Sequence, residues 1–186
     1  MLYAFIDRDG TMGGDYYVKY PWDYSPYPGT REAFRLLNEA GIPAIIITNQ
    51  SCIARGLDNG YDFAQEFRNI GATDWFICPH DTLDQCGCRK PEPGLLYQAQ
   101  RKYGMDIKDC YMIGDRWSDM AAGGRAGVHL ILVRTGRGQE SLGVDRGKWR
   151  DYEPDYIAND LFDAAQWLIA KCSKTSNMLE SLINAP

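Results

Sequence analysis

Two aspartates separated by one residue follow the first apolar run of the chain, in "FIDRDGT". Asp7 and Asp9 point to the same side of an extended backbone, as residues i and i+2 do. Two carboxylates this close repel each other unless a cation joins them or one of them keeps its proton. Mg²⁺ takes oxygen ligands in octahedral geometry, so the pair indicates a magnesium site. The simpler alternative is a solvated acidic loop at the end of a strand.

A second pair of aspartates follows a later apolar run, in "IGDRWSD". If the two runs are neighbouring strands, Asp115 can complete a Mg²⁺ site with the first pair. Asp119 lies one turn further along, where it could pair with Arg116 or Lys90, or orient a metal-bound water. The alternative for Asp119 is simple stabilisation of a helix N-terminus, which favours acidic residues.

Groups that bind anions follow two other apolar runs. Thr48 and Asn49 begin "TNQSCIARG" and can donate hydrogen bonds to phosphate oxygens, and Arg55 is a further candidate anion contact. An ordinary turn with a surface arginine is the alternative, because Asn and Ser also favour turns. Arg89 and Lys90 precede "PEPG", where a helix is expected to begin, and a cation there strengthens a place already suited to anions.

Carboxylates, a lysine and a threonine at strand ends are typical of a site for phosphoryl transfer. In such a site Mg²⁺ neutralises the phosphate, one aspartate attacks phosphorus, and the other gives and takes the proton. Covalent catalysis through an aspartyl-phosphate is an established strategy. Enzymes accelerate phosphate-monoester hydrolysis by up to ~10²¹-fold. Most of that acceleration must come from positioned charge.

A cluster of cysteines precedes the two cations, in "FICPHDTLDQCGCRKPEPG" at residues 76–94. Three cysteines and one of the two histidines of the chain fall within residues 78–88. The cluster could be a redox centre, a catalytic metal site, or a structural clip. The other three cysteines, Cys52, Cys110 and Cys172, are expected to be small buried hydrophobes.

The elements that must position these residues alternate along the chain. Short apolar runs predict strands at residues 2–6, 44–48, 75–78, 111–114, 129–133 and 156–158. Helical spacing predicts helices at 30–41, with Thr30 as N-cap, and at 61–71, 93–104, 118–127 and 160–171. This alternation predicts an α/β fold with a doubly wound, three-layer parallel sheet. Ligands of such sheets bind at the carboxyl ends of the strands, where the residues described above lie.

Length and composition fit one domain. The chain has 186 residues, of which 45% are hydrophobic and 24% charged, and its net charge is −5. We expect a phosphatase domain at residues 1–172, a polar loop at 134–153, and a tail at 173–186 that is either a short docking helix or a frayed end. The acidic balance argues against nucleic acid as a partner.

Its apolar runs are far shorter than the roughly 20 residues that cross a bilayer, so no membrane association is expected. The N-terminus does not read as a signal peptide, and we expect a cytoplasmic location. Cysteines in that compartment are free or metal-bound more often than paired in disulfides. The oligomeric state is left open.

Four motifs together resemble a known superfamily. "DRDGT", "TNQ", "RKP" and "GDRWSD" look like the motifs of the haloacid dehalogenase (HAD) phosphohydrolases, in the order and spacing of that superfamily. With "CPH…CGCRKPEPG" and "LVRTGRG" they are similar to the D-glycero-D-manno-heptose 1,7-bisphosphate 7-phosphatases and, slightly less, to the histidinol-phosphate phosphatases. The resemblance covers about residues 1–170 and implies a Mg²⁺-dependent hydrolase of carbohydrate metabolism, without a large cap domain, that removes the 7-phosphate of a heptose bisphosphate.

The resemblance implies a role for each matching residue. Asp7 would be the nucleophile, and Asp9 the general acid/base, whose backbone carbonyl also binds Mg²⁺. Asp115 would complete the Mg²⁺ site with Asp7, while Thr48 and Lys90 would steady the phosphoryl group. The full set of expected substrate contacts is Asn49, Ser51, Arg55, Arg89, Arg116 and the loop that begins at Asp15.

Both phosphatase groups carry a zinc loop between their second and third motifs. Here Cys78, His80, Cys86 and Cys88 fit Zn²⁺ as a closed tetrahedral Cys₃His set, which leaves no position open for catalysis. We expect this zinc to be structural and to hold the loop that ends in the two cations.

Some residues favour other substrates or functions. Arg116 matches the histidinol-phosphate group, whereas "IARG" and "KPEPG" favour the heptose group, and Cys52 replaces a usual Gly. The alternatives are therefore a histidinol-phosphate or other sugar-phosphate phosphatase, a catalytically inactive zinc-stabilised binding module, and a redox protein that uses the C-x-C pair.

Overall fold

A computed structural model describes residues 2–14 and 20–183 of the chain, with residues 174–183 as backbone only. Its centre is a sheet of six parallel strands in the order β3-β2-β1-β4-β5-β6. The strands are β1 (Ala4–Ile6), β2 (Ala44–Asn49), β3 (Asp74–Cys78), β4 (Tyr111–Gly114), β5 (His129–Val133) and β6 (Tyr156–Ala158). All six strands predicted from the sequence are confirmed, and so is the parallel α/β fold.

Strand order reverses at the middle of the sheet. Ala4 of β1 is in register with Ala44 of β2 on one side and with Tyr111 of β4 on the other. The chain therefore moves outward in one direction through β2 and β3, then returns and moves outward in the other direction through β5 and β6. The carboxyl ends of β1 and β4 meet at this switch point, which is where parallel sheets bind ligands.

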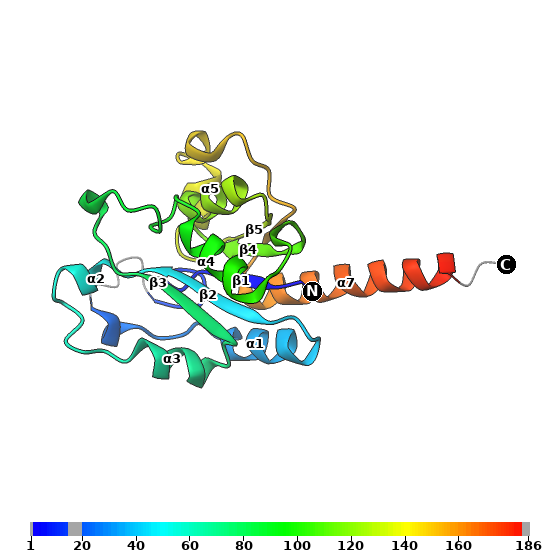
Figure 1. Cartoon of the computed structure of the whole chain (residues 1–186), viewed down its shortest axis with the longest axis horizontal. Helices are drawn as coiled ribbons and strands as arrows, with labels where there is room; N and C mark the ends of the chain where they lie inside the picture. Colours follow the sequence, from blue (N-terminus) through cyan, green and yellow to red (C-terminus); the bar gives the residue numbers. More distant parts are fainter. Residues whose placement is uncertain (1, 15–19, 184–186) are drawn as a thin grey trace.

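Helices cover both faces of the sheet. They are α1 (Thr30–Glu39), α2 (Ser51–Ala54), α3 (Phe63–Ile70), α4 (Gly94–Tyr103), α5 (Trp117–Ala126), α6 (Gly138–Leu142) and α7 (Leu161–Ile183), with 3₁₀ turns η1 (Pro21–Asp23), η2 (Thr82–Asp84), η3 (Ile107–Asp109) and η4 (Arg146–Trp149). Buried side chains of α1, α3 and α7 pack on one face, and those of α4 and α5 on the other. Figure 1 shows these two layers on opposite sides of the strands.

The side chains of each strand alternate between the two layers. Ala4 and Ile6 belong to the core under α1, whereas Phe5 between them belongs to the core under α4 and α5. All three side chains are fully buried. Strands buried on both faces consist of continuous apolar runs, as the strands of this sequence do.

Two local expectations are wrong. Thr30 is the first residue of α1, not its N-cap, which is Gly29 in a left-handed conformation with φ of 82°. The Thr30 hydroxyl instead donates to the Met12 carbonyl at 2.7 Å, so a contact distant in sequence takes the group that would cap the helix. Residues 134–153 are not simply a loop, because they form α6 and η4 around Trp149, which is 1% exposed.

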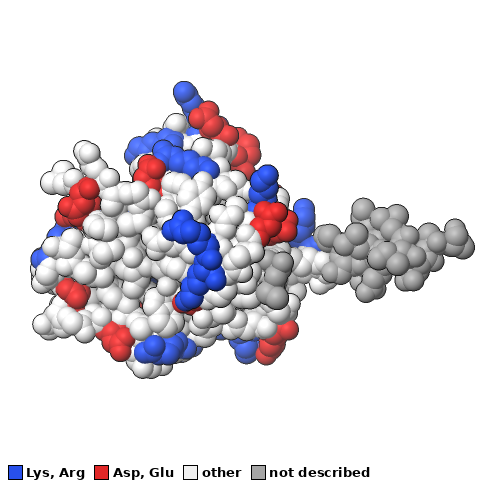
Figure 2. Space-filling model, in the orientation of Figure 1, with Lys and Arg blue, Asp and Glu red and all other residues white. Residues whose placement is uncertain are grey.

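The C-terminal helix is longer than expected. A helix was predicted at residues 160–171, but the backbone of α7 continues to Ile183 and projects past the sheet (Figure 1). The division into a domain and a tail at residue 173 stays a prediction, since the helix runs across it. Among the described residues, no helix is long and apolar enough to span a membrane. Figure 2 shows basic and acidic side chains interspersed on this face of the molecule.

Candidate active site

Three aspartates meet at the switch point of the sheet. Asp7 follows β1, Asp115 follows β4, and Asp119 lies in the first turn of α5. One carboxylate oxygen from each lies within 4.8 Å of the others, and all three residues are buried. Burial, followed by the charges of neighbouring aspartates, raises the pKa of Asp115 to about 8 and that of Asp119 to about 6. A donor set of hard oxygens at this spacing fits a divalent cation such as Mg²⁺.

Backbone geometry holds Asp115 in place. Its Oδ1 accepts a hydrogen bond from the Thr11 hydroxyl at 3.0 Å, and its Oδ2 accepts one from the Arg137 backbone N–H at 2.7 Å. Gly10 and Gly136 lie on either side, both with positive φ, and a Cβ on either would stand 2.3 Å from Asp115 Oδ2. The carboxylate therefore fits only because both neighbours lack a side chain.

Lys90 reaches the aspartate group from the segment between β3, an outer strand of the sheet, and α4. Its Nζ lies 2.5 Å from Asp7 Oδ1 and 2.7 Å from Asp119 Oδ1, and it donates to the Ile47 carbonyl at 2.8 Å. Burial alone would lower the pKa of Lys90, but the two carboxylates outweigh it and raise that pKa. Lys90 is thus a fixed positive charge beside the carboxylate predicted to attack phosphorus.

The Asp9 carboxylate stands outside this group of three and has partners of its own. Its Oδ1 accepts from Arg8 Nη1 at 2.6 Å, and its Oδ2 accepts from Gln50 Nε2 at 2.7 Å. The side chain is 23% exposed and lines the central cavity. Burial raises the pKa of Asp9 above its ordinary value, although Arg8 opposes the change. A carboxyl that holds its proton more tightly is a suitable general acid.

The expected phosphate contacts on the β2 side have other partners. The Thr48 hydroxyl is buried and accepts from Gln50 Nε2 at 3.0 Å. Asn49 pairs with the peptide of Lys90, accepting its N–H at 3.0 Å and donating to its carbonyl at 3.1 Å. Arg55 is exposed and forms a two-point ion pair with Asp81, at 2.6 and 2.7 Å. Of these three, only Asn49 lines the central cavity, and its side chain is engaged in holding Lys90.

Asp7, Asp9 and Asp119 line a cavity of about 440 Å³. Four basic residues line it as well, Arg89, Lys90, Arg116 and Arg137. Burial alone would lower the pKa of Arg116, but Asp115 and other nearby carboxylates raise it. The volume is typical of pockets for small metabolites. Ser51 does not line this cavity, and Asp15 lies outside the described residues.

The four predicted zinc ligands converge beside this cavity. The three sulfurs lie 3.3 Å (Cys78–Cys88), 3.6 Å (Cys78–Cys86) and 3.5 Å (Cys86–Cys88) apart. His80 Nδ1 is 3.5 Å from the Cys78 sulfur and 3.3 Å from that of Cys88. Sulfurs bound tetrahedrally to Zn²⁺ at about 2.3 Å would lie about 3.8 Å apart, only slightly wider than observed. All six cysteines of the chain are free thiols.

The cluster is joined to the cations by short covalent and hydrogen-bonded paths. Arg89 and Lys90 directly follow Cys88 in the chain, and Arg89 Nη1 donates to the His80 carbonyl at 3.0 Å. The Gly94 N–H donates to the Gly87 carbonyl at 3.1 Å, where the loop meets the start of α4. Whatever orders the cluster therefore also orders both cations.

Comparisons with known proteins agree with this geometry. A family model described as HAD-hydrolase-like matches residues 87–164. The D-glycero-beta-D-manno-heptose-1,7-bisphosphate 7-phosphatase of Pseudomonas aeruginosa is 36% identical over 74% of this chain and 84% of its own length. The Escherichia coli protein of the same name is 34% identical over 72% and 79%. The chain belongs to the HAD superfamily of hydrolases.

A solved structure from the same superfamily extends the likeness to nearly the whole fold. It is D,D-heptose 1,7-bisphosphate phosphatase from B. bronchiseptica complexed with magnesium and phosphate. Its TM-score is 0.79 at 31% identity, and the match covers 92% of this chain and 99% of that one. As a HAD hydrolase whose curated relatives are named phosphatases, the chain is a phosphatase.

Several residues of this HAD site were not predicted. Thr11 and Gly136, which hold Asp115, lie 104 residues before it and 21 residues after it in sequence. Thr11, Gln50, Gly136 and Arg137 lie within "DRDGT", "TNQ" and "LVRTGRG", so the motifs mark their positions but not their roles. Glu66, in the middle of α3, lies in no motif, and its role appears only in the tertiary structure.

Replacing Gly136 with Ala should disable the site while leaving the fold intact. The new Cβ would displace the Asp115 carboxylate, and a misplacement of about 1 Å can cost about 100-fold in rate. We expect kcat/KM for p-nitrophenyl phosphate to fall about 100-fold. Gly41→Ala is the matched control, because Gly41 also has a positive φ but nothing within 4 Å of its added Cβ. Gly41→Ala should lose about 1–2 kcal/mol of stability, and Gly136→Ala should lose more, because its Cβ would also stand 2.5 Å from the Gly10 Cα. Equal activities of the two variants would contradict the prediction.

Proposed function

We propose that this HAD phosphatase removes the 7-phosphate of D-glycero-D-manno-heptose 1,7-bisphosphate, with Mg²⁺ and through an aspartyl-phosphate, as an enzyme of carbohydrate metabolism. The observation that carries the proposal is the placement of Asp7, a buried carboxylate with Lys90 at 2.5 Å and two further carboxylates beside it. It is supported by the names of the relatives and by the magnesium and phosphate in the B. bronchiseptica structure.

The proposed reaction has two steps. In the first, an Asp7 oxygen forms a bond to phosphorus, the ester P–O bond breaks, and Asp9 gives its proton to the departing sugar oxygen. In the second, Asp9 takes a proton from water as that water attacks phosphorus, which releases inorganic phosphate and restores the Asp7 carboxylate. Lys90 offsets negative charge on Asp7 and on the phosphoryl oxygens throughout.

The metal would be held by side chains of Asp7 and Asp115, with the Asp9 carbonyl as a third ligand. Bound there, Mg²⁺ supplies positive charge to the phosphoryl oxygens. Asp119 does not need to bind the metal directly, since it accepts the Arg116 backbone N–H at 2.9 Å and pairs with Lys90. Its part is to hold Lys90 in line with the nucleophile.

The cavity supports a substrate with two phosphates. Besides Lys90, three arginines line it, namely Arg89, Arg116 and Arg137, which are enough cations to contact two phosphate groups, and the carboxylates of Glu92 and Asp145 line it as well. Those two carboxylates would attract the ammonium group of histidinol phosphate, the alternative substrate, so the names of the relatives favour the heptose bisphosphate more than the charge of the cavity does. Relatives named for the beta and the alpha anomer of the heptose are 36% and 35% identical, so both anomers belong in any substrate test.

Zinc is proposed as a structural part of the enzyme. Three thiols and an imidazole form a closed donor set, and structural sites of this kind contribute folding energy directly. The proposed function of the metal is to fix Arg89 and Lys90 at the cavity. A reducing, cytoplasmic location remains part of the proposal, supported by the six free thiols.

Changing Asp7 to Asn should abolish hydrolysis of every phosphate ester. The amide cannot form the aspartyl-phosphate, so we expect kcat to fall by on the order of 10³-fold or more. Asp109→Asn, on exposed η3, is the charge-matched control and should keep full activity. A rate of phosphate release unchanged by Asp7→Asn would rule out Asp7 as the nucleophile, whereas wild-type protein that releases no phosphate from any ester would favour a binding module.

A panel of substrates should show both the metal requirement and the preference. Phosphate release would be measured for the alpha and beta heptose bisphosphates, a hexose 6-phosphate and histidinol phosphate. We expect the highest kcat/KM with a heptose bisphosphate, loss of activity in EDTA, and recovery when Mg²⁺ is restored. A preference for histidinol phosphate would overturn the substrate assignment, and full activity in EDTA would overturn the metal.

Purified protein should contain about one zinc per chain. Cys88→Ser should lower the zinc content and, because Arg89 and Lys90 follow directly, should also lower kcat/KM for phosphate esters. Cys172→Ser, a half-buried cysteine outside the cluster, is the matched control and should change neither quantity. The zinc content is read by elemental analysis. Protein that is active without zinc, or zinc unaffected by Cys88→Ser, would contradict the proposed clip.

A further inference from the structure

A charged side chain lies buried between the two aspartates of the first motif. Arg8 is fully buried, and its guanidinium forms a two-point ion pair with Glu66 of α3, at 2.8 Å (Nε–Oε1) and 2.7 Å (Nη2–Oε2). Its remaining nitrogen, Nη1, donates to Asp9 Oδ1 at 2.6 Å. One planar group thus connects a residue of α3 to the carboxyl that the proposed function uses as the acid and base.

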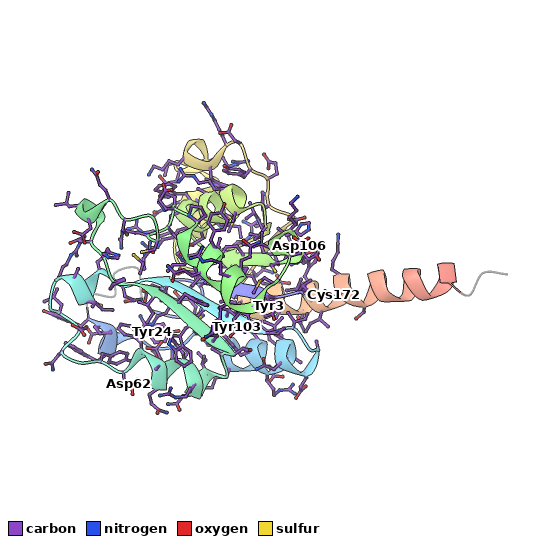
Figure 3. The ribbon with its side chains drawn as sticks, in the orientation of Figure 1. Tyr3, Tyr24, Asp62, Tyr103, Asp106 and Cys172 are labelled. Carbon is purple, nitrogen blue, oxygen red and sulfur yellow. The ribbon has the colours of Figure 1, made fainter. Side chains whose placement is uncertain are left out.

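Aromatic side chains enclose this connection. The ring of Tyr24 lies 3.8 Å from the guanidinium carbon and that of Phe63 lies 5.5 Å from it. Tyr61 donates its hydroxyl to Glu66 Oε2 at 2.8 Å. Tyr24 lies on the α3 side of the sheet, as Figure 3 shows. Packed on all sides, Arg8 has little freedom to turn its third donor away from Asp9.

The Asp9 carboxyl is anchored at both oxygens. Arg8 holds Oδ1, and Gln50 Nε2 holds Oδ2 at 2.7 Å. Each carboxyl oxygen has two lone pairs, so each keeps one for a proton or a further bond. Two donors from different elements fix the plane of the carboxyl, while its exposed part faces the cavity.

A purely structural explanation does not account for this arrangement. Burying an arginine and a glutamate costs desolvation free energy, and their mutual attraction does little more than offset that cost. An apolar pair of similar volume would often be at least as stable. The ion pair uses Nε and Nη2, and Nη2 also donates to the Pro21 carbonyl at 3.3 Å, which leaves Nη1 for Asp9. The planar fork of arginine suits this task, because its donors are fixed at set angles in one plane, whereas the donors of a lysine all radiate from one nitrogen and could not span Glu66 and Asp9 in the same plane.

We propose that Glu66 and Arg8 are positioning residues, which hold the Asp9 carboxyl in the orientation for proton transfer to the leaving oxygen. This inference rests on the proposed function, because it assumes that Asp9 is the general acid. It makes α3, a helix 58 residues away in sequence, part of the active site. Tyr61 supports the same chain of contacts through Glu66.

A positioning role for Glu66 should affect alkyl and aryl phosphate esters differently, which a merely structural role would not. An alkyl phosphate has a poor leaving group, which depends on the proton from Asp9 as the ester bond breaks. The leaving group of p-nitrophenyl phosphate departs with little protonation. If Glu66 acts through Asp9, its loss should impair the alkyl substrate far more than the aryl one, as seen in kcat/KM, which reports the first step.

The test compares Glu66→Gln with wild type on a hexose 6-phosphate and on p-nitrophenyl phosphate. General acid catalysis contributes about 10²–10⁴-fold, and partial misorientation should forfeit part of it. We expect kcat/KM to fall about 10–100-fold for the alkyl ester, mainly in kcat, and at most about 3-fold for the aryl ester. Glu32→Gln is the matched control, because Glu32 forms a similar two-point pair with Arg35 on the exposed side of α1.

Two further variants keep the inference testable if Glu66→Gln folds poorly. Tyr61→Phe removes one hydrogen bond to Glu66 without a change of charge, and Arg8→Lys keeps the charge but loses the fork. Both should shift the alkyl-to-aryl ratio in the same direction as Glu66→Gln, Tyr61→Phe by the smaller factor. Equal losses on the two esters, or a change only in KM, would overturn the positioning role. If the wild type hydrolyses the heptose bisphosphate but not the hexose 6-phosphate, the heptose bisphosphate serves as the alkyl ester. Wild-type protein that releases phosphate from neither the heptose bisphosphates nor these two esters would instead overturn the proposed function.

Discussion

The mutual repulsion of three buried carboxylates is the constraint on which the rest of this structure depends. Asp7, Asp115 and Asp119 lie close together and are buried, so water screens their charges poorly. Other contacts must therefore offset the electrostatic repulsion between them. The sheet supplies two of the three carboxylates through the adjacency of β1 and β4. Lys90 supplies the compensating charge, and the missing side chains of Gly10 and Gly136 supply the space. The strain of collecting these charges is what prepares the site to bind a cation and a phosphate.

Much of the fold followed from the sequence because its strands are continuous apolar runs bounded by polar residues. That pattern identifies parallel strands buried on both faces, and the strand ends then locate the site. The expectations that were wrong depend on distant partners. Thr30 gives its hydroxyl to Met12 instead of capping its own helix, and the polar segment around Trp149 folds because the indole N–H finds the Ser141 carbonyl at 2.8 Å. No local pattern encodes such contacts.

The residues of the site also fall into two groups, those that the local sequence predicts and those that depend on partners distant in sequence. Asp7, next to a strand end, and Lys90, just before a helix, could be predicted because their type and their place agree. Arg55 and Asn49 have the right type, but one pairs with Asp81 and the other holds the Lys90 peptide. Glu66 was not predicted because nothing in the sequence indicates its partner. That partner, Arg8, lies between Asp7 and Asp9, and the chemistry of the two aspartates is enough to explain the motif without it. Sequence thus indicates the groups that react, whereas the groups that orient them appear only with the tertiary structure.

Two segments of the chain contribute basic residues to the cavity, one after β3 and one after β5, and they are called the first and the second arm below. Their charges bear on how an acidic protein binds an anion. The loop after β3 brings Arg89 and Lys90, and the segment after β5 brings Arg137, while Arg116 lies between them at the start of α5. The net charge of −5 belongs to the whole chain, whereas a phosphate at this site meets four cations in a partly enclosed cavity. Five acidic residues line the same cavity, so the cations favour an anion by their placement and not by their number. Each arm is also tied to the aspartates, because Lys90 Nζ of the first lies 2.5 Å from Asp7 Oδ1 and the Arg137 backbone N–H of the second donates to Asp115 Oδ2 at 2.7 Å. A change in either arm would therefore disturb the carboxylates as well as the lining that a substrate contacts.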